Sequence, residues 1–120
     1  MFYTNVSQIS GKILHRWVDD NGDRHESFDD FSPELFVPSH TDTQYSGING
    51  ERLDAVQFST IRDAKVFVEE YSDISNFSVH GNQTFWAQFI AKNYPGEVPW
   101  DIDQMVVANL DIECRMGEGF

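Results

Sequence analysis

The sequence has few cations, one cysteine and no long apolar run. Its 120 residues contain eight Lys and Arg against twenty Asp and Glu, which gives a net charge of −12. An acidic surface repels phosphate backbones, so the composition argues against tight nucleic-acid binding by the chain alone and suits cation binding or simple solubility. The single Cys114 excludes an intrachain disulfide and is typical of a reducing compartment.

The sequence also lacks the signals for membrane insertion or export. No apolar stretch approaches the ~20 residues that span a bilayer, and the start, MFYTNVSQIS, has no basic region followed by a long apolar one. We therefore expect a soluble intracellular protein with no membrane partner. The length fits one domain, and an apolar fraction of 40% is typical of a globular fold rather than a disordered chain.

The first thirty residues predict a three-stranded antiparallel meander. Residues 2–9 and 12–18 are rich in β-formers, and Asn21-Gly22 favours a type I′ hairpin turn before a third strand. Two irregular segments are expected next, a short connector at 33–38, bracketed by two prolines, and a polar loop at 39–52.

The type I′ turn fixes which residues of the second and third strands face each other. It places Trp17 opposite Glu26 and His15 opposite Phe28. One face of the meander is then expected to collect the apolar side chains of Phe2, Val6, Ile13, Trp17 and Phe28.

Two helices are expected in the second half of the chain. Ser59-Thr60 caps a helix that runs to about residue 72, with an apolar stripe made of Ile61, Ala64, Phe67, Val68 and Tyr71. Residues 76–80 predict a short strand. Asn82 can cap a second helix, which Pro95 ends.

Residues 105–114 carry the clearest pattern in the chain. The even positions are small or apolar, namely Val106, Ala108, Leu110, Ile112 and Cys114, whereas the odd positions become polar in Asn109, Asp111 and Glu113. This alternation predicts a strand with one buried face and a second face that turns acidic at its C-terminal end.

Asp111 and Glu113 are the candidate chemical residues. Two positions apart on a strand, they point the same way with α-carbons roughly 6.5 Å apart. Carboxylates this close repel each other unless a cation lies between them, and hard oxygen ligands suit Mg²⁺ or Mn²⁺, which assist phosphoryl transfer. The alternative is that the strand emerges into solvent there and both carboxylates are simply hydrated.

Other chemical motifs are absent. The DDNGD stretch at 19–23 does not fit a calcium loop, because a glycine at the sixth position would put Trp17 at the first. The four histidines show no metal-ligand spacing with one another or with Cys114. The sequence has no phosphate-binding glycine motif and no nucleophile elbow.

Three stretches of the sequence resemble the family B DNA polymerases of T-even-type phages. ANLDIE, at 108–113, is similar to their first exonuclease motif, in which an apolar strand delivers Asp-Ile-Glu. RWVDDNGDRHESF with SPELF, within 16–36, resembles their opening hairpin, and YSGINGERLDAVQFSTIRDAKVFVEEYSDI, at 45–74, resembles the segment that follows. The resemblance covers nearly the whole chain, in order.

The resemblance implies a fold and a function. Residues 1–104 would be the N-terminal domain of a replicative DNA-directed DNA polymerase, and 105–120 the truncated first strand of its RNase H-like 3′–5′ proofreading exonuclease. The fold class is then α+β, with an N-terminal meander, two helices and this C-terminal strand. Asp111 would be the carboxylate shared by two Mg²⁺ or Mn²⁺ ions, and Glu113 a ligand of the ion that activates the attacking water.

The resemblance also implies partners and a location. The partners would be the remainder of the polymerase polypeptide and the DNA primer-template, in the cytoplasm of a bacterial host. In some members the N-terminal domain is implicated in binding the polymerase's own messenger RNA, a role that the charge of −12 disfavours here.

Several alternatives stay open. The chain is expected to be a piece of a longer polypeptide, and an expressed fragment, a split gene product and a truncated reading frame all fit. The alternative function is a non-catalytic acidic interaction module of a phage replication complex. An autonomous nuclease would need a further carboxylate near Asp111, and Asp101 and Asp103 lie at the wrong end of the strand.

Without the exonuclease sheet, the strand should pair within the domain, pair with a second copy in a homodimer, or be poorly ordered.

Overall fold

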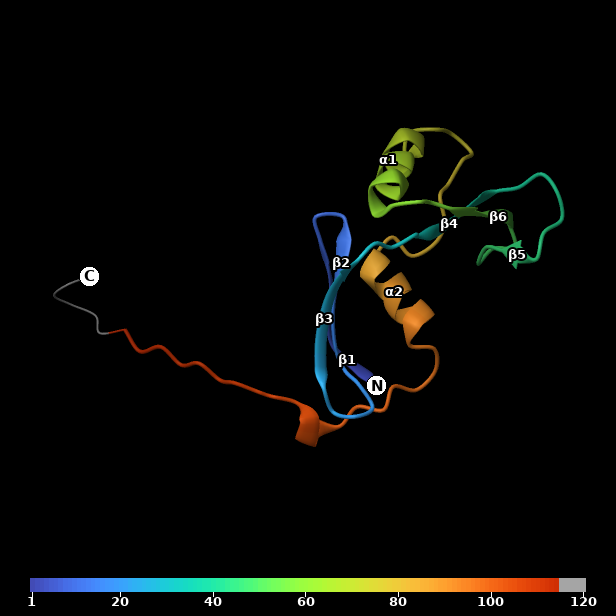
Figure 1. Ribbon diagram of the computed structural model, residues 1–120. Coiled ribbons are helices and arrows are strands. Elements are labelled where there is room, and N and C mark those ends of the chain that lie inside the picture. The colour runs from blue at the N-terminus through green and yellow to red at the C-terminus, as the bar shows by residue number, and fades with distance from the viewer. Residues whose placement is uncertain (115–120) are drawn as a thin grey trace.

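The computed structural model describes residues 1–114, which form two antiparallel sheets and two helices, an α+β fold as expected (Figure 1). The elements are β1 (Phe2–Ile9), β2 (Lys12–Val18), β3 (Arg24–Asp29), β4 (Glu34–Pro38), β5 (Tyr45–Ser46), β6 (Arg52–Gln57), α1 (Ile61–Tyr71), α2 (Phe85–Asn93) and the 3-10 turn η1 (Ile102–Gln104). The first sheet has the order β1-β2-β3 and the second β4-β6-β5. No helix within these residues has the length and apolarity needed to cross a membrane.

The predicted hairpin between β2 and β3 forms, but its turn is of a different type. The loop closes through a bond from the Asp19 N–H to the Asp23 carbonyl at 2.9 Å and one from the Gly22 N–H to the Asp19 carbonyl at 3.0 Å. Gly22 has a φ of 84°, the left-handed conformation that ends a three-residue hairpin loop. The Asp19 carboxylate favours this loop because it accepts the N–H groups of Asn21 and Asp23, each at 2.9 Å.

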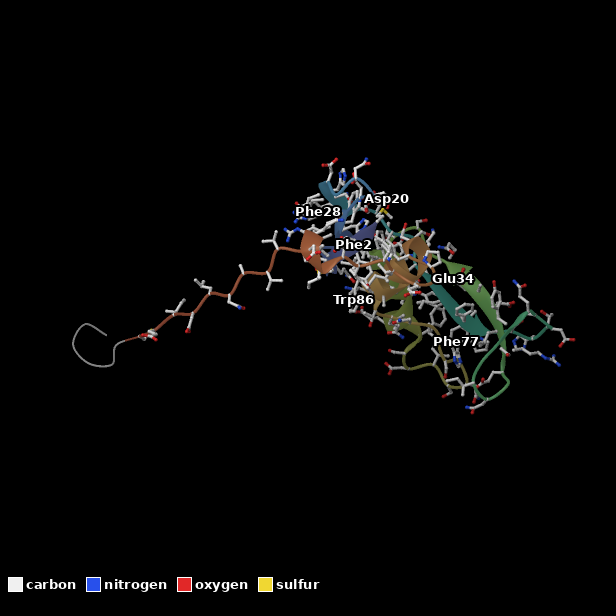
Figure 2. The ribbon with its side chains drawn as sticks, turned by 90° about the horizontal axis from the view of Figure 1, so that it is seen from below. Phe2, Asp20, Phe28, Glu34, Phe77 and Trp86 are labelled. Atoms are coloured by element: carbon white, nitrogen blue, oxygen red, sulfur yellow. The ribbon has the colours of Figure 1, made fainter. Side chains whose placement is uncertain are left out.

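The longer loop shifts the register of β3 by one residue. Trp17 lies opposite His25 rather than Glu26, and Phe28 lies opposite Leu14. Because side chains alternate between the faces of a strand, this shift moves Phe28 out of the predicted apolar face. Its side chain is 55% exposed, on the surface of the meander (Figure 2).

None of the three strands of the second sheet was predicted from the sequence, and the short β5 lies within the expected polar loop. The expected connector at 33–38 is the edge strand β4, and β6 follows the expected polar loop. Proline at the start and end of a strand is compatible with an edge, where ladder hydrogen bonds are not needed on both sides. The two prolines that suggested a connector are therefore consistent with a short edge strand.

The free edge of β4 is covered by side chain and backbone. The Gln88 amide of α2 accepts the Glu34 N–H at 3.0 Å and donates to the Glu34 carbonyl at 2.8 Å. Further along, Phe36 and His80 exchange backbone hydrogen bonds of 2.8 and 2.7 Å. The strand expected at 76–80 is thus reduced to a single bridge that protects the edge.

The helices are close to expectation. Helix α1 is capped by Thr60, whose side-chain oxygen accepts the Asp63 N–H at 3.0 Å, as predicted. Helix α2 begins later than a cap at Asn82 would place it, because Asn82 binds the N–H of Thr84 in a turn before the helix. Its apolar face then starts at Phe85.

The core lies where the meander, the chain leading into β4 and both helices meet. Its buried side chains are Ile13, Phe31, Leu35, Ile61, Ala64, Phe85 and Phe89. Helix α2 contributes two of the three phenylalanine rings of this cluster and packs against β1 of the meander (Figure 1). Burial of each such ring stabilises the fold by roughly 1.5–3 kcal/mol through loss of water contact.

One polar side chain of the described residues, His15, is buried beside this core. Its Nε2 shares a hydrogen bond with the Tyr94 hydroxyl at 2.6 Å, and its Nδ1 lies 3.7 Å from the Asp29 carboxylate. Burial lowers the pKa of His15 below its ordinary value, and Asp29 opposes this shift only in part. Burial likewise raises the pKa of the Tyr94 phenol. His15 is therefore held in its neutral form.

We expect Phe85→Ala to lower the free energy of unfolding by about 3–5 kcal/mol, because it leaves a cavity in the core. The matched control is Phe28→Ala on the surface of β3, which should change it by less than about 1 kcal/mol. Urea unfolding followed by circular dichroism measures both. A large loss for Phe28→Ala would support the register predicted from the sequence and contradict the one described here.

We also expect stability to fall as the pH drops from 7 towards 5. The unfolded chain takes up a proton at the ordinary pKa of His15, whereas the folded chain resists protonation, so acid favours unfolding in this window. In His15→Gln this part of the pH dependence should disappear, while His40→Gln, at an exposed loop position, should keep it. Thermal unfolding at several pH values is the measurement. An unchanged slope in His15→Gln would contradict this account.

Candidate metal-ligating segment

Residues 105–114 leave the domain as an extended chain without strand pairing (Figure 1). The sequence predicted a strand with Val106, Ala108, Leu110 and Ile112 buried, and this is wrong for the described chain. Val106 is 80% exposed and Leu110 88%, and the outer part of the segment stands clear of the rest of the molecule (Figure 2). The reason is that a strand needs a neighbour, and within residues 1–114 no strand pairs with this segment.

Asp111 and Glu113 are both exposed on this segment. Within residues 1–114, no three His, Cys, Asp or Glu side chains come together as a metal site. Of the two acidic residues that precede the segment, Asp101 uses its carboxylate locally: it accepts the Asp103 N–H at 3.0 Å and the Gln104 side-chain amide at 3.0 Å, which shapes η1. The described residues therefore offer two hard oxygen ligands and do not bring a third to them.

The start of the segment is fixed to the meander by two hydrogen bonds. The indole N–H of Trp100 donates to the Tyr3 carbonyl at 3.0 Å, and the Arg24 guanidinium donates to the Gln104 carbonyl at 2.7 Å. The rings of Tyr3 and Trp100 meet edge to face with centroids 5.3 Å apart. No sequence pattern indicated these contacts, because they join residues 80 and 97 positions apart.

A groove of about 610 Å³ lies between the meander and residues 104–107. Its walls hold three aromatic side chains and two of the eight cationic residues of the chain, namely Tyr3, Trp17, Trp100, Arg16 and Arg24. The guanidinium of Arg16 is paired with Glu26 at 2.7 Å. The groove thus presents aromatic rings and positive charge together on a molecule that is acidic as a whole.

Trp17 and His25, which line this groove, belong to a stack of three rings. Trp17 lies between His15 and His25, with centroids 4.3 and 5.0 Å away and planes inclined by less than 20°. The ring of His25 is held by Asp19, whose carboxylate accepts from Nε2 at 2.7 Å. This hydrogen bond from His25 is the main reason that the pKa of Asp19 lies below its ordinary value.

The comparisons with known proteins agree on one kind of relative. No family model matches the chain. It is 31% identical over 121 aligned residues, 99% of its length, to a DNA-directed DNA polymerase of Escherichia phage RB69. It is 26% identical over 112 residues, 93% of its length, to a DNA-directed DNA polymerase of Enterobacteria phage T4.

The chain spans only 13% and 12% of the length of these two relatives. The match runs through the hairpin, both sheets, both helices and nearly all of the extended segment, so it is not confined to a short motif. The chain is homologous to a segment of the DNA-directed DNA polymerases of T4-type phages.

Proposed function

We propose that the chain is the part of a phage-type replicative DNA polymerase that leads into its 3′–5′ proofreading exonuclease. The observation that supports this most is the segment 105–114. It is extended, apolar on alternate positions, exposed, and ends in Asp111 and Glu113. A single chain gains nothing by exposing such a segment, whereas a longer polypeptide with a neighbouring strand would bury it.

In this proposal the chain divides between two domains. Residues 1–104 belong to the N-terminal domain of the polymerase, and 105–120 begin the first strand of an RNase H-like exonuclease domain. Residues 115–120 lie outside the part that the structure describes. Pairing with strands of the remaining polypeptide would cover the apolar positions of the segment and set Asp111 and Glu113 on one face.

The chemistry of the two carboxylates suits Mg²⁺ or Mn²⁺. Both ions prefer oxygen ligands, and two of them held about 4 Å apart can stabilise the attacking and leaving oxygens of a phosphodiester. Asp111 would be shared by the two ions, and Glu113 would hold the ion that activates the attacking water. The further ligands, and the groups that bind the DNA primer-template, would come from the remaining polypeptide.

A second candidate is a non-catalytic module that contacts other proteins of a phage replication complex. The net charge of −12 favours it, since an acidic surface can bind a basic partner without any metal. The two proposals differ in what Asp111 and Glu113 do. Only the polymerase proposal requires both carboxylates for a metal-dependent reaction.

We expect the isolated chain to show no degradation of single-stranded DNA with Mg²⁺ or Mn²⁺ and no nucleotide incorporation. Two carboxylates bind such ions weakly, and the described residues bring no three potential metal ligands together. Supplying the remaining polymerase polypeptide in trans should restore exonuclease activity. The double change Asp111→Ala, Glu113→Ala should then lower the exonuclease activity about a hundredfold or more while sparing polymerisation.

The matched control for this experiment is Glu69→Ala, Glu70→Ala, which removes two exposed carboxylates from helix α1. It changes the charge equally and should leave digestion of a labelled oligonucleotide unchanged. Robust digestion by the isolated chain, lost in the Asp111, Glu113 variant, would show that a complete site exists without the remaining polypeptide. If exonuclease activity is restored in trans and neither double variant changes it, Asp111 and Glu113 are not required for the reaction, which would favour the interaction module.

We further expect weak binding of single-stranded DNA or RNA by the isolated chain. If only Arg16 and Arg24 of the groove contact phosphates, the logarithm of affinity should fall with the logarithm of salt with a slope of about −1.4. Fluorescence anisotropy of a labelled oligonucleotide over a salt series measures this. A sub-micromolar Kd at physiological salt would contradict this view of the surface.

A further inference from the structure

We propose that Arg24 and Trp100 are positioning residues for the metal-ligating segment, because they fix the point and the register at which it leaves the meander. This inference rests on the function proposed above for Asp111 and Glu113. It adds a role for two side chains that lie outside the Asp-Ile-Glu motif and do not touch the metal.

The contact of Arg24 is specific to the backbone of the segment. Its guanidinium donates to the carbonyl of Gln104 at 2.7 Å, at the C-terminal end of η1. Carbonyls at the end of such a turn lack internal partners, and a cationic donor satisfies them well. Arg16 lines the same groove but pairs with Glu26, and within the described chain no hydrogen bond joins its side chain to residues 100–107.

Trp100 supplies the second point of attachment. Its indole N–H binds the Tyr3 carbonyl at 3.0 Å, and its ring packs edge to face on the ring of Tyr3. The ring of Tyr3 in turn packs edge to face on that of Tyr94, with ring centroids 5.0 Å apart. Two attachments, four residues apart along the chain, fix a direction as well as a position.

The turn between the two attachments is itself braced. Asp101 accepts from the Asp103 N–H and the Gln104 amide, both at 3.0 Å, and the Met105 N–H donates to the Ile102 carbonyl at 3.2 Å. Residues 100–105 therefore form a short rigid unit on the end of the meander. The extended chain begins directly after it.

The distance from this unit to the carboxylates makes its placement important. Asp111 is seven residues beyond Gln104, or about 23 Å along an extended chain. We call residues 100–105, with their contacts to Arg24 and Tyr3, the anchor. A change of about 10° in the direction in which the chain leaves the anchor moves Asp111 by about 4 Å, as far as the separation of two catalytic ions. A slip of one residue along a neighbouring strand would turn both carboxylates to the opposite face. Arg24 and Trp100 oppose both the change of direction and the slip in register.

The first arm of the test measures how firmly the anchor is held in the isolated chain. In Arg24→Gln, hydrogen exchange at the amides of Gln104 and Met105 should rise about three- to tenfold, the effect expected for losing a partly exposed charge-assisted hydrogen bond. Arg16→Gln removes the same charge from the same groove and should leave these amides unchanged. Arg24→Lys keeps a cationic donor and should restore part of the protection.

Trp100→Phe provides an independent variant for the other attachment. It retains an aromatic ring against Tyr3 and removes only the N–H donor, so it should also raise exchange at Gln104 and Met105. Amides of helix α1 serve as an internal reference for folding, since they lie outside the anchor. Equal exchange in wild type, Arg24→Gln and Trp100→Phe would overturn the proposed anchor.

The second arm measures positioning with the remaining polymerase polypeptide supplied in trans. Arg24→Gln should raise the Mg²⁺ concentration for half-maximal exonuclease activity several-fold, leave polymerisation unchanged, and recover in Arg24→Lys. An unchanged Mg²⁺ dependence, with exonuclease present in wild type, would overturn the positioning role and leave the proposed function standing. Absence of exonuclease in wild type would overturn the proposed function and the positioning role together, and the exchange result would still report on the anchor.

Discussion

Helix α2 contacts both sheets, and the position of one sheet against the other depends on the side chains along it. Phe85 and Phe89 fill the core between them. Gln88 binds the backbone of Glu34 on the edge of β4. Immediately after the helix, Tyr94 binds His15 of the meander. The helix is therefore anchored to the second sheet by an amide and to the first by a phenol, with two buried rings between these contacts.

This arrangement explains how the anchor at Trp100 becomes possible. The chain leaves α2 beside the meander because Tyr94 is held there by His15, and six residues later Trp100 reaches the carbonyl of Tyr3. The path of residues 95–105 is thus set by the core contacts before it. A loss of α2 packing would release the anchor as well as the sheets.

The sequence predicted the parts of the fold that are specified locally. Helix α1 was predictable because its cap and its apolar stripe lie within residues 60–71, and the β2–β3 hairpin because Asn21-Gly22 marks a turn. The register of the hairpin was not predictable, since it depends on which loop the Asp19 carboxylate stabilises. Strands β4 and β6 were missed because prolines suggested a connector and because their residues pair about twenty positions apart, and the two-residue β5 was missed because it lies in a polar loop.

The candidate site likewise combines features that are specified locally with features that depend on distant residues. Asp111 and Glu113 were identified from their two-residue spacing and from the resemblance, both of which are local features of the sequence. The burial predicted for the apolar positions around them was wrong, because burial depends on a neighbouring strand that the described residues do not provide. Arg24 and Trp100 were not found, since a hydrogen bond to a backbone carbonyl leaves no complementary residue type to recognise.

The way in which Gln88 closes the edge of β4 has a consequence for how this interface can change over evolution. The hydrogen bonds of Gln88 to Glu34 involve only main-chain atoms of Glu34, and the amide and carbonyl that it binds exist for nearly every residue type. The side chain at position 34 is therefore free to vary, whereas position 88 must supply a donor and an acceptor on one planar group. Selection on the contact falls on one residue of the pair, so the joint between sheet and helix can persist while the strand diverges. Such a contact would leave no trace of covariation between its two positions.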